Sequence, residues 1–148
     1  MKRTIKLVDQ MDDKIYFAAN GFGLVDKVAS TGFRIDPSIN DEGVLEGANV
    51  KSVGIGNCVD EATLIFLFED GEKFKSTAWS GFDCEGISYF TFSKEQLEKL
   101  SSTKLKTIRF TNGHSFESQT SDVPEEHKDC FIEVAKELKD KTYKVVIE

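Results

Sequence analysis

The sequence predicts an α+β protein with a mainly antiparallel β-sheet, a C-terminal amphipathic helix packed on one face and one short helix between strands. Three observations support this class. A β-hairpin pattern occupies residues 62–79, a strand-and-turn pattern occupies residues 105–119, and an amphipathic helical pattern follows. A chain of 148 residues with 39% hydrophobic residues can bury one core, so we expect a single domain over residues 1–148.

The hairpin at 62–79 turns at Asp70-Gly71, because glycine adopts positive φ without a Cβ clash. Two registers are compatible with this turn. A two-residue loop places Phe66 opposite Lys75, whereas a three-residue loop with a left-handed Gly71 places Phe66 opposite Phe74. We expect the second register, since it pairs apolar side chains on one face.

The first strand of this hairpin is apolar on both faces, so we expect it inside the sheet rather than at an edge. In the preferred register Ala62 faces Ala78. Lys73 and Lys75 then lie on the other face, where their aliphatic stems cover neighbouring apolar side chains.

Other β-type runs flank the hairpin. We expect strands at 3–8, 14–19, 50–55, 87–92, 105–111 and 143–147. We expect residues 21–28 to be irregular and residues 34–36 to be extended. Residues 37–49, rich in turn formers and acids, read as a long loop, and Asn112-Gly113 reads as the turn into 115–119.

Two segments carry helical signals. Ser93 and Gln96 form a capping-box pattern before a short helix at 94–101. A second box pairs Asp122 with Glu125 at the start of the last helix, where Pro124 is tolerated in the first turn. That helix carries an apolar stripe, with His127 and Cys130 at its edge, that must bury against the sheet: Phe131, Val134, Ala135 and Leu138.

The net charge of −7 is concentrated in the middle of the chain. Residues 41–92 hold three basic and ten acidic groups, whereas the segments on either side are nearly balanced. Nucleic-acid binding needs clustered Lys and Arg, so this charge disfavours it. An acidic surface is a solvated, solubilising face or a binding site for a basic partner.

The localisation stays open at this level. No run of about twenty apolar residues predicts a transmembrane segment. The first residues have a basic start but no apolar region typical of a signal peptide. The chain as written reads as cytoplasmic, or as a secreted or periplasmic domain if a leader was removed.

Three cysteines without a Cys-x-x-Cys spacing disfavour a structural zinc site. Cys58 and Cys84 lie at nearly equal distances from the hairpin turn, so a continued hairpin with one bulge would bring their sulfurs together. The two readings are a disulfide in an oxidising compartment and two free thiols near a loop. Cys130 reads as a core residue.

The sequence contains no catalytic signature, and we expect no cofactor. His127 and Cys130 are spaced to reach one metal ion, yet two ligands make half a site, and nothing in the sequence places His114 near them. Nucleophilic catalysis would need a base within hydrogen-bond reach of a serine or cysteine. The two histidines lie in a turn and at a helix edge, so the sequence does not support an enzyme of this kind. Acidic pairs such as Asp60-Glu61 read as loop solvation.

The loop 78–86 is the candidate recognition site. It contains Trp79 and Phe82 with two glycines and the acids Asp83 and Glu85, a composition suited to binding because aromatic side chains supply contact area. The alternative is that Trp79 caps the core.

The order of elements over residues 62–139 resembles that of small uncharacterised bacterial α+β domains. The resemblance rests on the Asp-Gly hairpin, the Cys-containing loop, the strand Tyr89-Phe90-Thr91-Phe92, the helix from Ser93, the run 106–110 and the final helix. It covers about half the chain. It implies a fold class and a bacterial setting, and no activity.

We therefore expect a non-catalytic binding or accessory module that recognises another protein through its acidic middle and the Trp79 loop. The alternative is a small-molecule binder or small enzyme with a pocket between sheet and helix, using Arg109 or His114. A third reading is a homo-oligomer joined at sheet edges.

Overall fold

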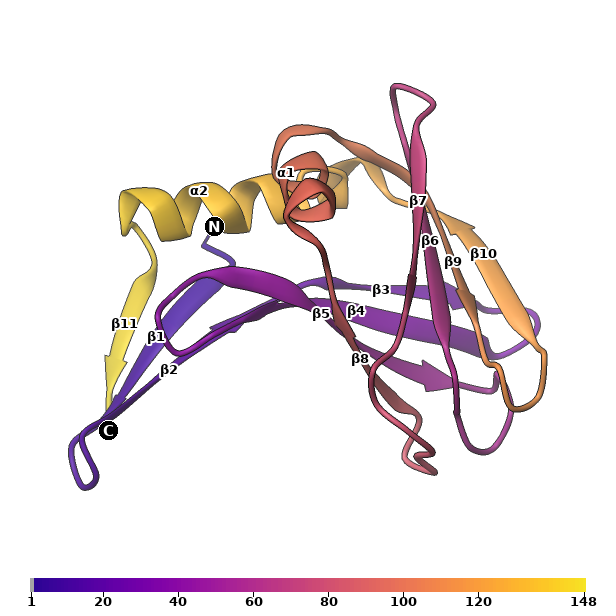
Figure 1. The fold of residues 1–148 in the computed structure, drawn as a ribbon, viewed down its shortest axis with the longest axis horizontal. Helices are drawn as coiled ribbons and strands as arrows, with labels where there is room; N and C mark the ends of the chain where they lie inside the picture. The colour runs from indigo at the N-terminus through magenta and orange to yellow at the C-terminus, as the bar shows by residue number, and fades with distance from the viewer. Residues whose placement is uncertain (1) are drawn as a thin grey trace.

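The computed structural model describes residues 2–148. Its fold is α+β with mostly antiparallel pairing, but the strands form three sheets rather than the single sheet expected, in the orders β11-β1-β2, β3-β4-β5-β8 and β10-β9-β6-β7 (Figure 1). The elements are β1 (Thr4–Asp9), β2 (Lys14–Ala19), β3 (Phe22–Asp26), β4 (Thr31–Ile39), β5 (Leu45–Val53), β6 (Thr63–Phe68), β7 (Lys73–Thr77), β8 (Ile87–Thr91), α1 (Lys94–Ser102), β9 (Leu105–Thr111), β10 (Ser118–Asp122), α2 (Cys130–Asp140) and β11 (Lys144–Ile147).

The two four-stranded sheets enclose an aromatic core. In Figure 1 the strands β6, β7, β9 and β10 run steeply across the direction of β3, β4 and β5, while α1 lies at the top near β7 and α2 extends from there above β1. Phe33 and Phe110, one from each sheet, have ring centroids 5.7 Å apart. Phe66 is fully buried and meets Phe92 edge-on at 5.7 Å and Phe131 of α2 at 6.2 Å. These contacts join both sheets to the last helix.

The structure confirms the three-residue register of the central hairpin. Phe66 lies opposite Phe74, and Gly71 adopts a left-handed φ of 87°. The Ala78 N–H donates to the Ala62 carbonyl at 2.8 Å, as that register requires. Because β6 pairs with both β7 and β9, its central position is also confirmed.

The segment 37–49 is not the long loop that its sequence indicated. β4 continues to Ile39 and β5 begins at Leu45, so only a short turn joins them. Pro37 is tolerated in β4 because β3 pairs with β4 only as far as Ile35, which leaves the Pro37 nitrogen on an unpaired side. Residues 22–26, expected to be irregular, form β3.

The capping-box predictions were right for α1 and wrong for the start of α2, although the C-terminal helix itself is present and buries Phe131 and Val134 as expected. The Ser93 hydroxyl accepts from the Gln96 N–H at 3.2 Å, and the Gln96 side chain accepts from the Ser93 N–H at 2.9 Å, which completes the capping box. Asp122 makes no box with Glu125. It ends β10, where its carboxylate accepts from the Thr107 hydroxyl at 2.8 Å, and α2 begins eight residues later.

A buried carboxylate ties the N-terminal strand to α2. Glu137 is only 7% exposed, and its Oε1 accepts from the backbone N–H groups of Arg3 at 3.0 Å and Thr4 at 2.7 Å. The Arg3 guanidinium bonds Glu133 at 3.0 Å on the same helix. β11 follows α2 and pairs in parallel with β1, so the chain end is anchored, as the 143–147 pattern indicated.

Truncation of Glu137 tests this anchor. Glu137→Ala leaves two buried N–H groups without an acceptor, so we expect the free energy of unfolding to fall by about 2–3 kcal/mol. Urea denaturation followed by circular dichroism measures the change. Glu98→Ala, which removes an exposed carboxylate from α1, is the matched control and should change stability by less than about 0.5 kcal/mol. Equal losses in both variants would contradict the anchor.

The tip of the β6–β7 hairpin is held to the helices by ion pairs. Lys99 of α1 bonds Asp70 and, at 2.8 Å, Glu72. Lys128, in the turn before α2, bonds Glu69 at 2.6 Å. The hydrogen bond from Lys99 holds the pKa of Asp70 below its ordinary value, and the hydrogen bond from Lys128 does the same for Glu69.

Removal of Lys99 should reverse the shift in Asp70. A carboxylate whose pKa is lower in the folded state adds stability above its ordinary pKa and loses it as the pH falls through the lower value. In Lys99→Ala we therefore expect the pKa of Asp70 to rise toward its ordinary value. Carboxyl NMR titration measures it, and an unchanged Asp70 pKa would show that the ion pair does not form in solution.

Candidate binding surface at the disulfide end

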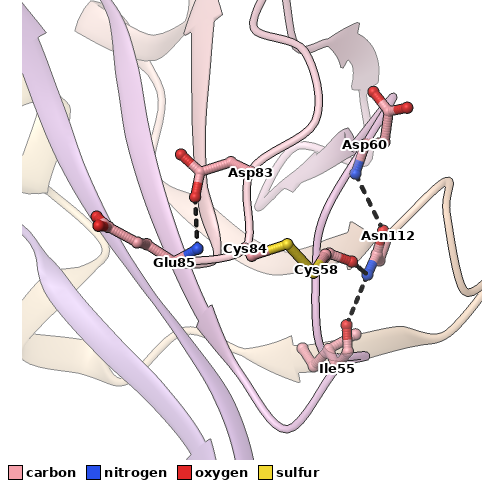
Figure 2. Close-up of a disulfide and its surroundings, with 7 residues drawn as sticks. All are labelled: Ile55, Cys58, Asp60, Asp83, Cys84, Glu85 and Asn112. Atoms are coloured by element: carbon pink, nitrogen blue, oxygen red, sulfur yellow. Dashed lines mark hydrogen bonds between the residues drawn. A yellow bond between two sulfur atoms is a disulfide. The ribbon is translucent and has the colours of Figure 1, made fainter.

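Three loops meet at one end of the molecule, where a disulfide joins two of them. We call this surface the disulfide end and define it as residues 54–61, 78–86 and 112–117. The structure places a disulfide between Cys58 and Cys84, with an S–S distance of 2.07 Å (Figure 2). Val59 and Asp83 form an antiparallel bridge beside it, with N–H···O distances of 2.8 and 2.9 Å. These bonds fasten the loop before β6 to the loop before β8.

The third loop is fastened by one amide side chain. Asn112 is fully buried, and its Nδ2 donates to the carbonyls of Ile55 and Cys58, both at 2.8 Å (Figure 2). Its Oδ1 accepts from the N–H of Asp60 at 3.3 Å and of His114 at 2.9 Å. Because a buried amide without partners is costly, this arrangement fixes the third loop to the loop before β6, which the disulfide in turn joins to the loop before β8.

The role of Asn112 corrects the turn predicted from the sequence. Asn112-Gly113 is not a two-residue turn, since Thr111 pairs with Ser118 and the connection spans residues 112–117. Gly113 is needed for close approach, because a Cβ there would lie 2.6 Å from the Glu61 carbonyl oxygen. Nothing in the local sequence distinguishes a buried bridging asparagine from an exposed turn asparagine.

The aromatic residues of the loop 78–86 face solvent. Trp79 is 68% exposed and Phe82 is 59% exposed, so Trp79 does not cap the core. Trp79 stacks on Tyr89 with ring centroids 5.6 Å apart, and the backbone N–H of Trp79 donates to the Tyr89 carbonyl at 3.0 Å. Phe82 meets His114 edge-on at 5.3 Å. Both exposed rings are therefore held by a second ring rather than left free.

The third loop also contains an exposed aromatic side chain. Phe116 is 85% exposed and adopts a positive φ of 62°, which is rare for a bulky side chain. The Phe116 N–H donates to the Asn112 carbonyl at 2.8 Å, and this bond maintains the turn. The sequence contained no signal for this conformation.

The disulfide end is acidic. Its three loops contain no lysine or arginine and five carboxylates, namely Asp60, Glu61, Asp83, Glu85 and Glu117. The Asp83 carboxylate accepts from the Glu85 N–H at 2.6 Å, so it also shapes its own loop (Figure 2). Charges of one sign gathered on one surface produce a negative potential that attracts cations.

The structure brings together five of the six residues expected to bind. Trp79, Phe82, Asp83, Glu85 and His114 all belong to the disulfide end, although no sequence pattern predicted that His114 lies beside Phe82. Arg109 lies elsewhere. Its side chain is exposed on the outer face of β9, where Nε donates to the Thr120 hydroxyl at 2.7 Å.

The helices and the sheet do form a groove, but it contains neither residue proposed for a small-molecule site. This groove has a volume of about 520 Å³ and is lined by Leu45, Leu97 and Leu138 with neighbouring residues. Arg109 and His114 do not line it. The groove therefore lacks the two side chains on which the alternative of a small-molecule binder or small enzyme was based.

The His127 and Cys130 pair is not arranged as a metal site. The Nδ1 atom of His127 lies 3.1 Å from Arg3 Nη2, and its ring stacks on Phe22 at 5.1 Å. Burial raises the pKa of Cys130 to about 12, which keeps it protonated. Among residues 2–148, no group of three or more His, Cys, Asp or Glu side chains is placed to hold an ion.

Within residues 2–148, no helix is long and apolar enough to cross a bilayer. No family model, curated protein or solved structure matches the chain. The resemblance to bacterial α+β domains therefore stays a prediction. The geometry and charge of the disulfide end are the features that bear on function.

The contribution of the disulfide to the free energy of unfolding can be measured. The disulfide spans 26 positions, and closure of such a loop in the unfolded chain is worth about 3 kcal/mol. We expect Cys58→Ala/Cys84→Ala to lose this stability in urea, and wild-type protein in reducing agent to lose about as much. Urea midpoints that are unchanged by both treatments would show that the disulfide does not form.

Proposed function

We propose that this protein is a non-catalytic module that recognises another protein through the disulfide end, and that the recognised surface is basic. The observation that carries the proposal is the exposure of Trp79 and Phe82 on a loop fixed by a disulfide and by the Val59–Asp83 bridge. Tryptophan is among the residues that dominate binding energy at protein interfaces, and both rings offer large contact areas.

Rigidity supports binding at this end. A loop that is ordered before association loses little conformational entropy when a partner docks. Trp79 is held by Tyr89 and Phe82 by His114, while the backbone below is bridged between Val59 and Asp83. The rings are thus presented in a fixed arrangement, which favours a specific partner over adaptable contacts.

The charge selects the chemistry of the partner. Five carboxylates without a lysine or arginine in the same loops favour cationic groups. Aromatic faces beside carboxylates also bind guanidinium and ammonium groups through cation–π contacts. A partner segment with exposed arginine or lysine side chains fits both features, and its association should weaken as salt is added.

The disulfide also supports a location. Such bonds persist in oxidising compartments and are reduced in most cytosolic environments. We propose that the protein works outside the cytosol, where Cys58 and Cys84 remain joined.

Peptide display tests the proposed recognition. Random peptides are selected on the oxidised protein, and the enriched sequences should be rich in arginine or lysine. Trp79→Ser should weaken their binding by roughly thirty-fold, because interface aromatic side chains are worth about 2 kcal/mol. Met11→Ser, at an even more exposed apolar side chain in the distant β1–β2 turn, should leave affinity unchanged.

Calorimetry or fluorescence anisotropy at two salt concentrations supplies the affinities. Circular dichroism and urea midpoints establish that each variant folds. Enrichment of acidic or uncharged peptides, or equal binding to the wild type and Trp79→Ser, would contradict the proposed surface and its partner chemistry.

A further inference from the structure

A second concave surface lies on the outer face of the β3-β4-β5-β8 sheet, outside the disulfide end. This groove has a volume of about 520 Å³ and is lined by residues of β3, β4 and β5 and of the β3–β4 turn. Val25, Gly32 and Val53 form one row across the three strands. Gly23, Arg34 and Lys51 form the next row. We call this surface the valine groove.

Two glycines create the groove. A Cβ at Gly32 would lie 2.8 Å from the Leu24 carbonyl oxygen, so the floor cannot carry a side chain without a shift of the backbone. A Cβ at Gly23 would meet nothing within 4 Å, so that position is open toward the groove. Val25 and Val53, 65% and 63% exposed, stand on either side of Gly32. The result is an apolar trough exposed to solvent.

The groove also has a cationic rim on a chain of net charge −7. Lys27, Arg34 and Lys51 line it, and no carboxylate does. Arg34 is paired with Asp36 at 3.0 Å, whereas Lys27 and Lys51 form no salt bridge within residues 2–148. The Oδ1 atom of Asp26, next to Lys27, accepts from the N–H groups of Val28 and Ala29, and Asp26 does not pair with Lys27. Two lysines therefore remain available to an anion.

The floor of the groove on β4 and β5 offers no backbone partner to a peptide, whereas β3, at the edge of the sheet, is paired on one side only. β4 is paired on both sides, with β3 and β5, and β5 is paired with β4 and β8, so the N–H and C=O groups of the floor are used within the sheet. A peptide laid here would lose hydration from its own backbone without compensation. An alkyl chain has no such requirement, because it brings no hydrogen-bonding groups into the trough.

We propose that the valine groove binds a free anionic amphiphile, an alkyl chain with a carboxylate head of the fatty-acid class. The chain lies along Val25, Gly32 and Val53, and the head group pairs with Lys51 beside Arg34. The volume lies within the range of small-molecule sites. This site uses different residues from the disulfide end, so it stands independently of the proposed protein recognition.

NMR titration of ¹⁵N-labelled protein with monomeric decanoate tests the site. We expect shifts in the amides of residues 23–34 and 51–53. Decyltrimethylammonium, which has the same chain and the opposite charge, should bind at least about ten-fold more weakly, and butyrate should not bind detectably. Equal affinity for the two head groups, or shifts confined to the groove between α1 and α2, would overturn the proposal.

Variants distinguish groove binding from non-specific adsorption. Gly23→Leu fills the open position and should abolish decanoate binding, and Val25→Ser removes apolar area from an exposed side chain and should weaken it. Lys51→Glu should weaken binding roughly five-fold or more, because an attraction becomes a repulsion. Lys75→Glu makes the same charge change on β7 of the other sheet and is the matched control. Retained affinity in folded Gly23→Leu would overturn the site.

Vesicles distinguish a free ligand from a lipid surface. Phosphatidylglycerol vesicles carry anionic heads and alkyl chains, but they do not offer single chains to a trough on a sheet. We expect decanoate to bind and the vesicles not to co-sediment the protein. Co-sedimentation that Gly23→Leu abolishes would overturn the free-ligand assignment in favour of a membrane surface.

Discussion

The register of the β6–β7 hairpin determines the rest of the structure. With Phe66 opposite Phe74, the inner face of β6 is entirely apolar and enters the core, while Lys73 lies beside Leu67 on the outer face. A shift by one residue would exchange these faces. The same register, continued past Ala62 and Ala78, carries the two chains of the hairpin toward Cys58 and Cys84, so core packing and the disulfide depend on one turn.

The continuation is not regular, and its irregularity produces the candidate site. The Val59–Asp83 bridge is shifted by two residues from the register of β6 and β7, so the loop 78–86 contains extra chain. That extra length places Trp79 and Phe82 outside the core, where the disulfide and Asn112 fix the backbone. The molecule thus combines an aromatic, acidic end with an apolar, cationic groove on the outer face of the β3-β4-β5-β8 sheet.

The sequence predicted the elements whose signals are local. The Asp-Gly turn, the Ser93 capping box and the β-type run at 105–111 each depend on neighbouring residues, and each was right. Features that depend on distant contacts were missed. Pro37 reads as a strand breaker until the end of β3 is known, and Asn112 reads as a turn residue until its partners Ile55 and Cys58 are near. The valine groove likewise exists only once β3, β4 and β5 align their glycines and valines.

The proposed function requires that the three loops of the disulfide end form one rigid surface. Backbone ¹⁵N order parameters of the oxidised protein test it directly. We expect order parameters near 0.85 for residues 54–61, 78–86 and 112–117, comparable to those of the strands. After reduction of the disulfide, the order parameters of residues 78–86 should fall. Values below about 0.6 in the oxidised protein would contradict it, because aromatic side chains on mobile loops would not form a preorganised surface.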